Sequence, residues 1–496
     1  MAKPDYIRSE LLQVLPTYQM VRDCYGGEQS VKGRMSYGSQ SVNNGGGSSN
    51  TLAISPYLPD PSPKSEDNDV RIARYNDYVT RAVFYNVTKR TIKAMTGSVF
   101  SKYPTFTLNE LSELETDVNG GGQSLVQQSR DALTNCLMQG RGGLLADMPV
   151  NTDGMSKAAM ASGGVRPVII HYDSESIINW RYRKVGGILK CCLVVLSESY
   201  VTEDDGYEQK IGRQLLVLRL NELDEAESEI LRKSKQGDWI SEGINSITDN
   251  SGKPLVDLPF YPYGSVNNDL EIDDSPMSDI AHLNIAHLRN SADYEEMLFL
   301  SATPTLVVSG LTEQWVNDVL ENGIAIGSRS GILLPIGGNA QMMQISADSA
   351  LANAMKEKED MMVSLGAKLI EQSKGNITAT QASNEQAEET SVLSSISNNV
   401  SDAYSKAFKA CAVFMGYKPD DLVYALNTNF GFSKMNPQQR AQLMSEYQGG
   451  LISFAEMRHA LIESEIALEE NNEVAAQTIA SEQGELMNQD RVIDGE

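Results

Sequence analysis

The stretch from Ser346 to Gly416 constrains the fold most, because it has the pattern of two long amphipathic helices joined by a short polar segment. In the first helix, apolar residues recur at three- and four-residue steps, interrupted only by Lys358: Leu351, Met355, Met362, Leu365 and Leu369. The second helix repeats this rhythm, with Gly416 suited to end it: Leu393, Ile396, Val400, Ala403, Ala407, Cys411 and Phe414. Such spacing places the apolar side chains on one face of each helix.

A polar segment, Ser373 to Ser383 (SKGNITATQAS), separates the two helices. It is built of small and polar residues and contains a glycine, so we expect a loop. On this pattern alone, an ordinary hairpin of a helix bundle with a solvated turn is an equally good interpretation. The rest of the chain bears on that choice.

The charge of the chain limits its partners. With 41 Lys and Arg against 66 Asp and Glu, the 496-residue chain has a formal net charge of −25. Proteins that grip the phosphate backbone are usually basic, so tight sequence-specific DNA binding is not expected. An acidic surface past which DNA slides without sticking remains compatible with this charge.

Composition also bears on the class of protein. The length allows about three domains, and no apolar run approaches the ~20 residues that span a bilayer. The N-terminus lacks the apolar core of a secretion signal. The five cysteines are scattered and lack metal-site spacing, which predicts reduced intracellular thiols, and the four histidines show no such spacing either. We therefore expect no metal, no cofactor and no membrane partner.

The first hundred residues contain the most basic stretch of the chain. A short helix is expected from Tyr6 to Leu15, and a flexible Gly/Ser/Asn-rich segment from Ser36 to Ser55. One long helix then runs from about Asp67 to Val99 and carries six basic residues: Arg71, Arg74, Arg81, Lys89, Arg90 and Lys93. We favour ion pairs within or between subunits as their role, with nucleic-acid contact as the alternative.

Strands are expected after a helix at Gln123 to Met138. They cover Leu144–Val150, Val168–Asp173, Ile188–Tyr200 and Arg213–Asn221, and a Pro- and aromatic-rich extended segment closes the region at Pro254–Gly264. The glycine cluster Gly140–Gly143 lies between a helix and a strand, and no GKS or GKT follows it. It is therefore expected to be a tight turn rather than a phosphate loop.

Four carboxylates in this region could suggest a catalytic cluster: Asp173, Glu175, Asp204 and Asp205. Nothing in the sequence brings them together, so solvated turn residues are the better interpretation.

Helix returns from Ser275 to Leu300, with Ser275 as a cap and Pro276 in the first turn. Short strands or turns follow, around a helix expected from Thr312 to Asn322. Beyond the central helix pair, an acidic tail has expected helices at Pro437–Tyr447 and Phe454–Leu461. The last residues, from about Gln483, lack a periodic core and should fray.

This order of elements resembles the portal proteins of tailed bacteriophages, in particular a portal-like family catalogued as a domain of unknown function in podovirus- and siphovirus-type phages. A strand-rich α/β region precedes one long helix, which is followed by a small α/β insertion, a returning helix, a polar loop, a second long helix and an acidic helical tail. The resemblance covers roughly Tyr75 to Glu463. The matching words are RAVFYNVTKRTIKAMTGSVFSKYP (Arg81 to Pro104), SDIAHLNIAHLRNSADYEEMLFLSATPTLVVSGL, GSRSGILLPIGGNA, the helix from Leu351 to Ile370, and LNTNFGF.

The resemblance implies an α+β, mainly helical portal fold that assembles as a ring. Its parts are an α/β wing, a helical stem, a small α/β clip and a helical crown. Mapped onto this chain, they are an N-terminal arm with the Gly/Ser-rich segment (1–66), the wing (67–274), a stem helix (275–302), the clip (303–345), the returning stem helix (346–372), the tunnel loop (373–383), the wing helix (384–416) and the acidic helical crown and tail (417–496).

The function implied is that of a closed homo-oligomeric ring, a dodecamer, at one capsid vertex of the virion. Such rings assemble in the host cytoplasm, and double-stranded DNA is packaged and ejected non-specifically through their axial channel. The implied partners are the terminase large subunit, head-completion or tail adaptor proteins, and the major capsid and scaffolding proteins. The acidic balance suits sliding DNA, and the missing phosphate loop suits a motor carried by another polypeptide.

Two groups of residues are site candidates under this resemblance. The tunnel-loop candidates are Lys374, Gly375, Asn376, Thr378, Thr380 and Gln381. Lys374 is the only formal charge of the loop, so a ring would carry a modest positive collar that touches phosphates transiently. In the clip, Trp315 and Arg329 are the candidates for docking partners, with burial of Trp315 in the clip's own core as the alternative.

Two other classes stay open. One is a different capsid-associated adaptor or scaffold protein, which would lack the order of helix, insertion and helix. The other is a hydrolase or nuclease, which needs clustered Asp, Glu or His and a metal. We find no such compact motif and expect no catalytic, cofactor-binding or metal residues.

Overall fold

The computed structural model describes residues 3–33, 55–61, 67–148, 165–234, 237–302, 305–310, 312–313, 334, 336–343, 349–368, 392–428, 430, 437–463, 466–467, 471–479 and 481. Helices and antiparallel sheets are mixed along these residues, which confirms the α+β class. The chain divides into two compact units, Met1–Thr428 and Asn429–Glu496.

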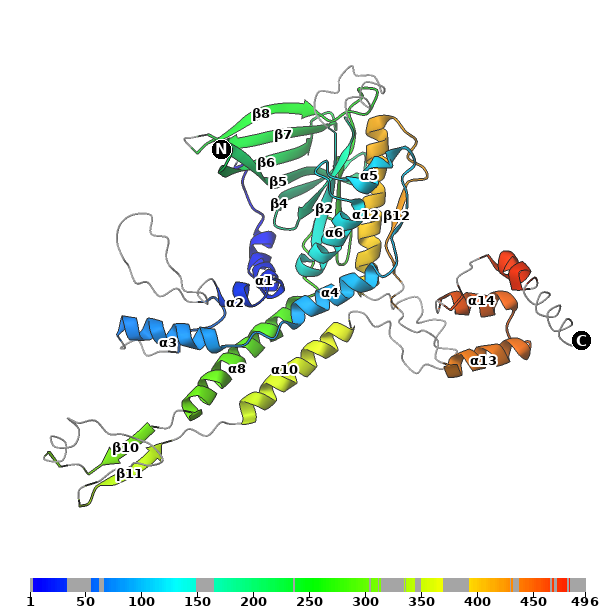
Figure 1. Cartoon of the computed structure of the whole chain (residues 1–496). Coiled ribbons are helices and arrows are strands. Elements are labelled where there is room, and N and C mark those ends of the chain that lie inside the picture. Colours follow the sequence, from blue (N-terminus) through cyan, green and yellow to red (C-terminus); the bar gives the residue numbers. More distant parts are fainter. Residues whose placement is uncertain are drawn as a thin grey trace, which may run out of the picture. The chain divides into compact units, whose positions relative to one another are not determined.

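The strands of the first unit form two larger antiparallel sheets (Figure 1). A three-stranded sheet has the order β3-β2-β9 and consists of β2 (Arg141–Asp147), β3 (Val168–Asp173) and β9 (Phe260–Gly264). A five-stranded meander follows sequence order: β4 (Ile177–Val185), β5 (Ile188–Asp204), β6 (Gln209–Leu220), β7 (Ala226–Lys233) and β8 (Trp239–Ser246). The strand predicted at 168–173 is confirmed, whereas the sequence interpretation missed β4, β7 and β8.

Helices α12 (Val392–Met415) and α6 (Leu125–Gln139) pack against each other and against the three-stranded sheet. The predicted apolar stripe of α12 is buried throughout. Two buried tyrosines bond to α6: Tyr404 Oη of α12 donates to Gln128 Oε1 at 3.0 Å, and Tyr424 Oη donates to Ser129 Oγ at 2.6 Å. Tyr424 belongs to β12 (Val423–Ala425), which pairs with β1 (Thr105–Thr107).

The predicted end of α12 is confirmed at Gly416. This residue has a φ of 65°, and the next amide, Tyr417 N, donates back to Ala412 O at 2.8 Å. A glycine adopts this left-handed conformation without strain and satisfies the last carbonyls of the helix.

The glycine cluster after α6 is only partly the turn that was expected. Gly140 ends the helix with a φ of 78°, but Gly142 and Gly143 lie within β2. A Cβ atom on Gly143 would come within 2.2 Å of the Phe260 ring, and one on Gly142 would meet the Tyr263 hydroxyl at the same distance. These two glycines therefore make room for aromatic rings of the neighbouring strand β9.

The long helix predicted from 67 to 99 is wrong. The structure has two helices, α3 (Asn68–Arg81) and α4 (Val87–Val99), with an extended break that begins at Ala82 (ψ 137°). Asn86 starts the second helix, because its side chain accepts a hydrogen bond from Lys89 N at 2.9 Å. The residues between the helices bond to another part of the chain, as described below.

The N-terminal helix is longer than predicted. Helix α1 spans Ser9–Gly26 and contains Pro16, and the short α2 (Glu28–Lys32) follows. A proline inside a helix costs about 3 kcal/mol. Here the helix packs against α2, α4, α6 and α8, and burial of residues such as Tyr18 and Val21 offsets that cost.

The remaining elements of the first unit are η2 (Asn109–Leu111), α5 (Glu113–Thr116), α8 (Ser278–Ala302), β10 (Thr305–Ser309), β11 (Asn339–Met343) and α10 (Ser349–Lys368). Ser275 acts as expected before α8, since its Oγ accepts from Met277 N at 3.2 Å. In the second unit, helices α13 (Pro437–Gln448) and α14 (Phe454–Glu463) confirm the two predicted tail helices.

Candidate functional site: the helix pair α8 and α10

Helices α8 and α10 lie side by side and run in opposite directions (Figure 1). The chain reverses between them through β10 and β11, which pair antiparallel with Thr305 opposite Met343 and Ser309 opposite Asn339. The order of helix, small insertion and returning helix that the sequence predicted is therefore present in the structure.

Asn284 of α8 holds the break between α3 and α4. Its side chain is fully buried, and Oδ1 accepts from Val87 N at 3.1 Å, from Thr88 N at 3.1 Å and from Thr88 Oγ1 at 3.0 Å. Its Nδ2 donates to Tyr85 O at 2.8 Å. One amide thus supplies partners to the backbone of the break and to the first turn of α4.

About two turns further along α8, Ser291 has the same role. Its Oγ accepts from Val83 N at 3.0 Å, and the residue is 1% exposed. The break between the two helices is thus set by polar side chains of a helix about 200 positions away in the chain.

His287 connects α8 to α10. Its side chain is 2% exposed, its Nε2 lies 3.2 Å from Glu359 Oε1, and its ring lies 5.9 Å from the Tyr85 ring. Next to this contact on α10, Met362 is fully buried. The two helices therefore share a polar contact at the level of the α3–α4 break, beside a buried apolar residue of α10.

Helix α3 braces the second half of α8. Tyr78 Oη donates to Asp293 Oδ1 at 2.7 Å, and burial together with this carboxylate raises the pKa of Tyr78. Arg81 forms an ion pair with Glu296, and its guanidinium lies 4.3 Å from the centre of the Phe299 ring.

Four of the six basic residues of α3 and α4 have contacts of two kinds. Arg71 and Arg81 form ion pairs with Asp60 and Glu296, which confirms the favoured role within the chain for these two. Lys89 and Arg90 lie over aromatic rings instead, at 5.6 Å from Tyr25 and 5.3 Å from Tyr85.

Several large apolar side chains of the helix pair remain exposed. On α8 they are Phe299 (46%) and Leu300 (42%), and on α10 they are Met361 (51%) and Val363 (64%). Met361 and Val363 flank the buried Met362, so at 100° per residue they lie on opposite sides of the α10 packing stripe. The returning helix thus presents apolar surface on two sides.

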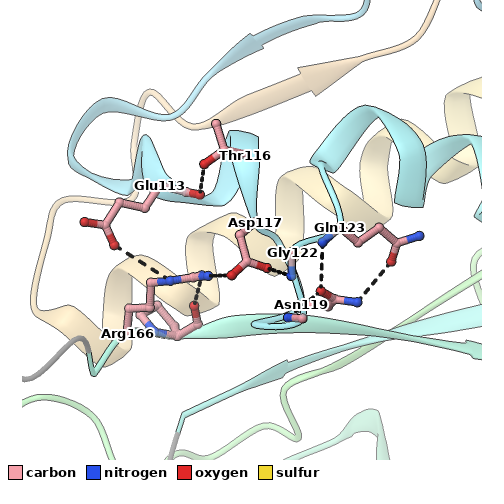
Figure 2. A network of polar contacts seen from close by, with 9 residues as sticks. Glu113, Thr116, Asp117, Asn119, Gly122, Gln123 and Arg166 are labelled. Carbon is pink, nitrogen blue, oxygen red and sulfur yellow. Dashed lines mark hydrogen bonds and ion pairs between the residues drawn. The ribbon is translucent and has the colours of Figure 1, made fainter.

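The glycine-rich loop that precedes α6, residues 117–123, is held by hydrogen bonds between its own residues (Figure 2). Gly122 N donates to Asp117 Oδ1 at 2.8 Å, and Asn119 Oδ1 accepts from Gly121 N at 2.8 Å. Arg166 holds the other oxygen of Asp117 at 2.5 Å. Because the amides of Gly121 and Gly122 bond to side chains of the same loop, these two amides are not available to bind a phosphate.

The four dispersed carboxylates are not gathered. Asp204 and Asp205 are exposed in the β5–β6 turn, where backbone amides lower the pKa of each carboxyl. Asp173 accepts from Ser176 N at 2.8 Å, and Glu175 pairs with Arg22. Within the described ranges, no group of three or more His, Cys, Asp or Glu could hold a metal ion.

The cysteines are all free thiols: Cys24, Cys136 and Cys411 are buried, and Cys191 and Cys192 are partly exposed.

Among the helices that the structure describes, none is both long and apolar enough to cross a membrane.

The predicted site residues lie outside the described residues. This holds for the tunnel-loop candidates Lys374, Gly375, Asn376, Thr378, Thr380 and Gln381, and for the clip candidates Trp315 and Arg329. The same is true of the helix predicted from Thr312 to Asn322, apart from its first two residues. The sequence analysis did not predict the role of the buried polar residues Asn284, His287 and Ser291 on α8. The one sequence feature that could have indicated it is their position on the apolar stripe of the helix.

A comparison with protein families concerns the segment that contains α8 and α10. A family model described as "Domain of unknown function (DUF4055)" matches residues 276–415, from just before α8 to the end of α12. This segment is thus similar to a domain family of unknown function. The sequence resemblance likewise named a family that is catalogued as a domain of unknown function. None of the curated proteins matches the chain.

Solved structures with some similarity come from gene transfer agent (GTA) particles. One is described as "Virion of native gene transfer agent (GTA) particle", with 15% identity, a TM-score of 0.38, and coverage of 76% of this chain and 89% of that chain. Another is described as "Neck of empty GTA particle computed with C6 symmetry", with 15% identity, a TM-score of 0.37, and coverage of 76% and 90%.

Proposed function

We propose that this chain is the ring-forming portal subunit of a phage-like virion. The observation that carries the proposal is the antiparallel pair α8 and α10 with its two-stranded insertion, in the segment where the portal-like sequence words and the family match coincide. The proposed ring is a dodecamer at one capsid vertex, assembled in the host cytoplasm and retained in the virion.

The exposed apolar side chains of α10 support closure into a ring. Head-to-tail contacts that close use two different surfaces of every copy. Met361 and Val363 lie on opposite sides of the buried stripe of α10, so each could contact a different neighbour. Burial of such side chains against a neighbour stabilises by roughly 1.5–3 kcal/mol each.

The channel of the ring would pass double-stranded DNA without sequence preference. The net charge of −25 supports weak adhesion. We place the tunnel loop at 373–383, where Lys374 would form the positive collar and the uncharged groups of Asn376, Thr378, Thr380 and Gln381 would face the DNA.

The clip at 303–345 would dock the other proteins of the vertex. We propose Trp315 and Arg329 as contacts for the terminase large subunit during packaging and for head-completion or tail adaptor proteins afterwards. Major capsid and scaffolding proteins would surround the ring. The chain itself would carry no catalytic activity and no cofactor, because the motor would be a separate ATPase.

The test substitutes the two exposed residues of α10 separately, as Met361→Asp and Val363→Asp. Val266→Asp is the matched control, since Val266 is 66% exposed and Val363 is 64% exposed. Size-exclusion chromatography with light scattering should show a ring for the wild type and the control, and smaller species for both α10 variants. Rings of unchanged mass in both α10 variants would contradict this role of α10.

A further inference from the structure

A cavity of about 500 Å³ lies between the two larger sheets of the first unit. Its walls come from the three-stranded sheet, from the strands β5, β6, β7 and β8 of the meander and from the end of α12. The apolar part of the wall includes Leu145, Ile170, Leu216, Leu218, Ile230 and Phe414. A cavity of this volume, with both apolar and polar residues in its wall, is the size of a site for a small organic ligand.

Three of the polar residues that line this cavity have ionisable side chains. They are Asp147 at the end of β2, Tyr172 of β3 and Glu198 of β5. Tyr172 Oη donates to Glu198 Oε1, and Gln214 Nε2 donates to Glu198 Oε2 at 2.8 Å. These two bonds hold the Glu198 carboxylate in one orientation.

The two carboxylates act on each other. Burial raises the pKa of Asp147, and the nearby charge of Glu198 raises it further. Among the described residues, Asp147 Oδ1 accepts from the adjacent amide, Met148 N, at 3.0 Å. Asp147 is an exposed residue that also lines the cavity, so it stands at the rim.

Neither carboxylate has a basic partner among the residues that the structure describes. Two arginines of β6 and β7 bond to other groups: Arg232 Nε donates to Gln214 Oε1 at 3.0 Å, and Arg213 Nε donates to Ser197 Oγ at 2.7 Å. Two like charges close to each other in the cavity wall create a negative potential that a cation relieves.

We propose that this cavity binds a small organic cation with an apolar body, an alkylammonium or alkylguanidinium. The alkyl body would lie along the leucine and isoleucine wall, and the charged head would pair with Glu198 and Asp147. A neutral molecule of the same length gains only the apolar contact, and an anion is repelled. The site is independent of the proposed ring, because all of its wall comes from one chain.

The test uses n-hexylammonium as the probe and 1-hexanol as the neutral probe of equal length, with isothermal titration calorimetry on the full chain. Hexylammonium should bind at least tenfold more tightly than hexanol. An acetyl-Gly-Gly-Lys-Gly-Gly-amide peptide added in a parallel titration distinguishes the two sources of such a group. Binding of the peptide assigns the site to a lysine side chain, and binding of the free amine alone assigns it to a small molecule; either supports the proposal.

The variants are Asp147→Asn and Glu198→Gln, which remove charge and keep shape. Asp204→Asn is the control, since Asp204 is an exposed carboxylate of the same sheet outside the cavity. Each cavity variant should weaken hexylammonium binding several-fold, while the control and hexanol binding stay unchanged. The rim position of Asp147 keeps its variant informative if Glu198→Gln disturbs the fold. Equal binding of the two probes, or full binding by Asp147→Asn, would overturn the proposal.

Discussion

The substitution Asn284→Ala should destabilise the first unit strongly, because one side chain satisfies four polar groups of the α3–α4 break. Each buried group left without a partner costs roughly 1–3 kcal/mol. Val87 N keeps a second acceptor, Tyr85 O at 2.9 Å, so fewer than four groups are orphaned. We therefore expect a loss of about 3–5 kcal/mol, which is large against the ~5–15 kcal/mol of a typical domain.

The assay combines chemical denaturation with hydrogen exchange measured by mass spectrometry. Peptides that contain Thr88 and the first turn of α4 should lose protection. Asn399→Ala is the matched control, because Asn399 is half-buried and bonds mainly to Gly264 O at 2.8 Å, so about 1 kcal/mol is expected. Equal losses in the two variants, or unchanged protection of α4, would refute the assignment of Asn284 as the residue that holds the break.

Three further predictions follow from local geometry and from the proposed function. Gly143→Ala should lower the melting temperature through its clash with Phe260, at a cost of about 1–3 kcal/mol. Gly97→Ala should raise the melting temperature, because Gly97 is an exposed position of helix α4 with nothing within 4 Å of an added Cβ; the opposite order would refute the packing argument. Arg166→Ala should speed hydrogen exchange in the glycine-rich loop of Figure 2 and leave α12 unchanged; exchange that stays slow would show that the loop does not depend on this ion pair. Lys374→Glu should leave rings intact but reduce packaging or retention of DNA, and normal values of both would exclude the positive collar.

The long periodic helices could be predicted from the sequence, because their burial depends on one stripe that the sequence displays. Helix α12 and its end at Gly416 are the best example. The strand at 168–173 could be predicted for a different local reason, because it is a short apolar run bounded by turn residues.

Other elements depend on distant partners and left little local signal. Asn284 and Ser291, about 200 positions away, determine the break after Arg81. The helical apolar stripe of the sequence continues through the break and therefore gave no sign of it. Strand β8 is exposed along most of its length, so it lacks the alternation that marks a strand. The cavity carboxylates Asp147 and Glu198 come from separate strands and meet only through the packing of two sheets.

The candidate site shows the same division. The helix pair was anticipated from periodicity and from the order of elements, but the polar contacts that join it, such as His287 with Glu359, were not. A histidine on an apolar stripe is compatible with many surroundings, and only the packing of α10 against α8 selects one.

The most direct test of the central claim is the mass and symmetry of the purified full-length chain, measured by mass photometry and negative-stain electron microscopy over a range of salt and protein concentrations. A closed dodecamer of the 54.3 kDa chain would have a mass of about 650 kDa and would appear as a ring with a central channel. The account predicts such rings. Monomers or dimers under every condition would contradict it and favour an adaptor or scaffold protein.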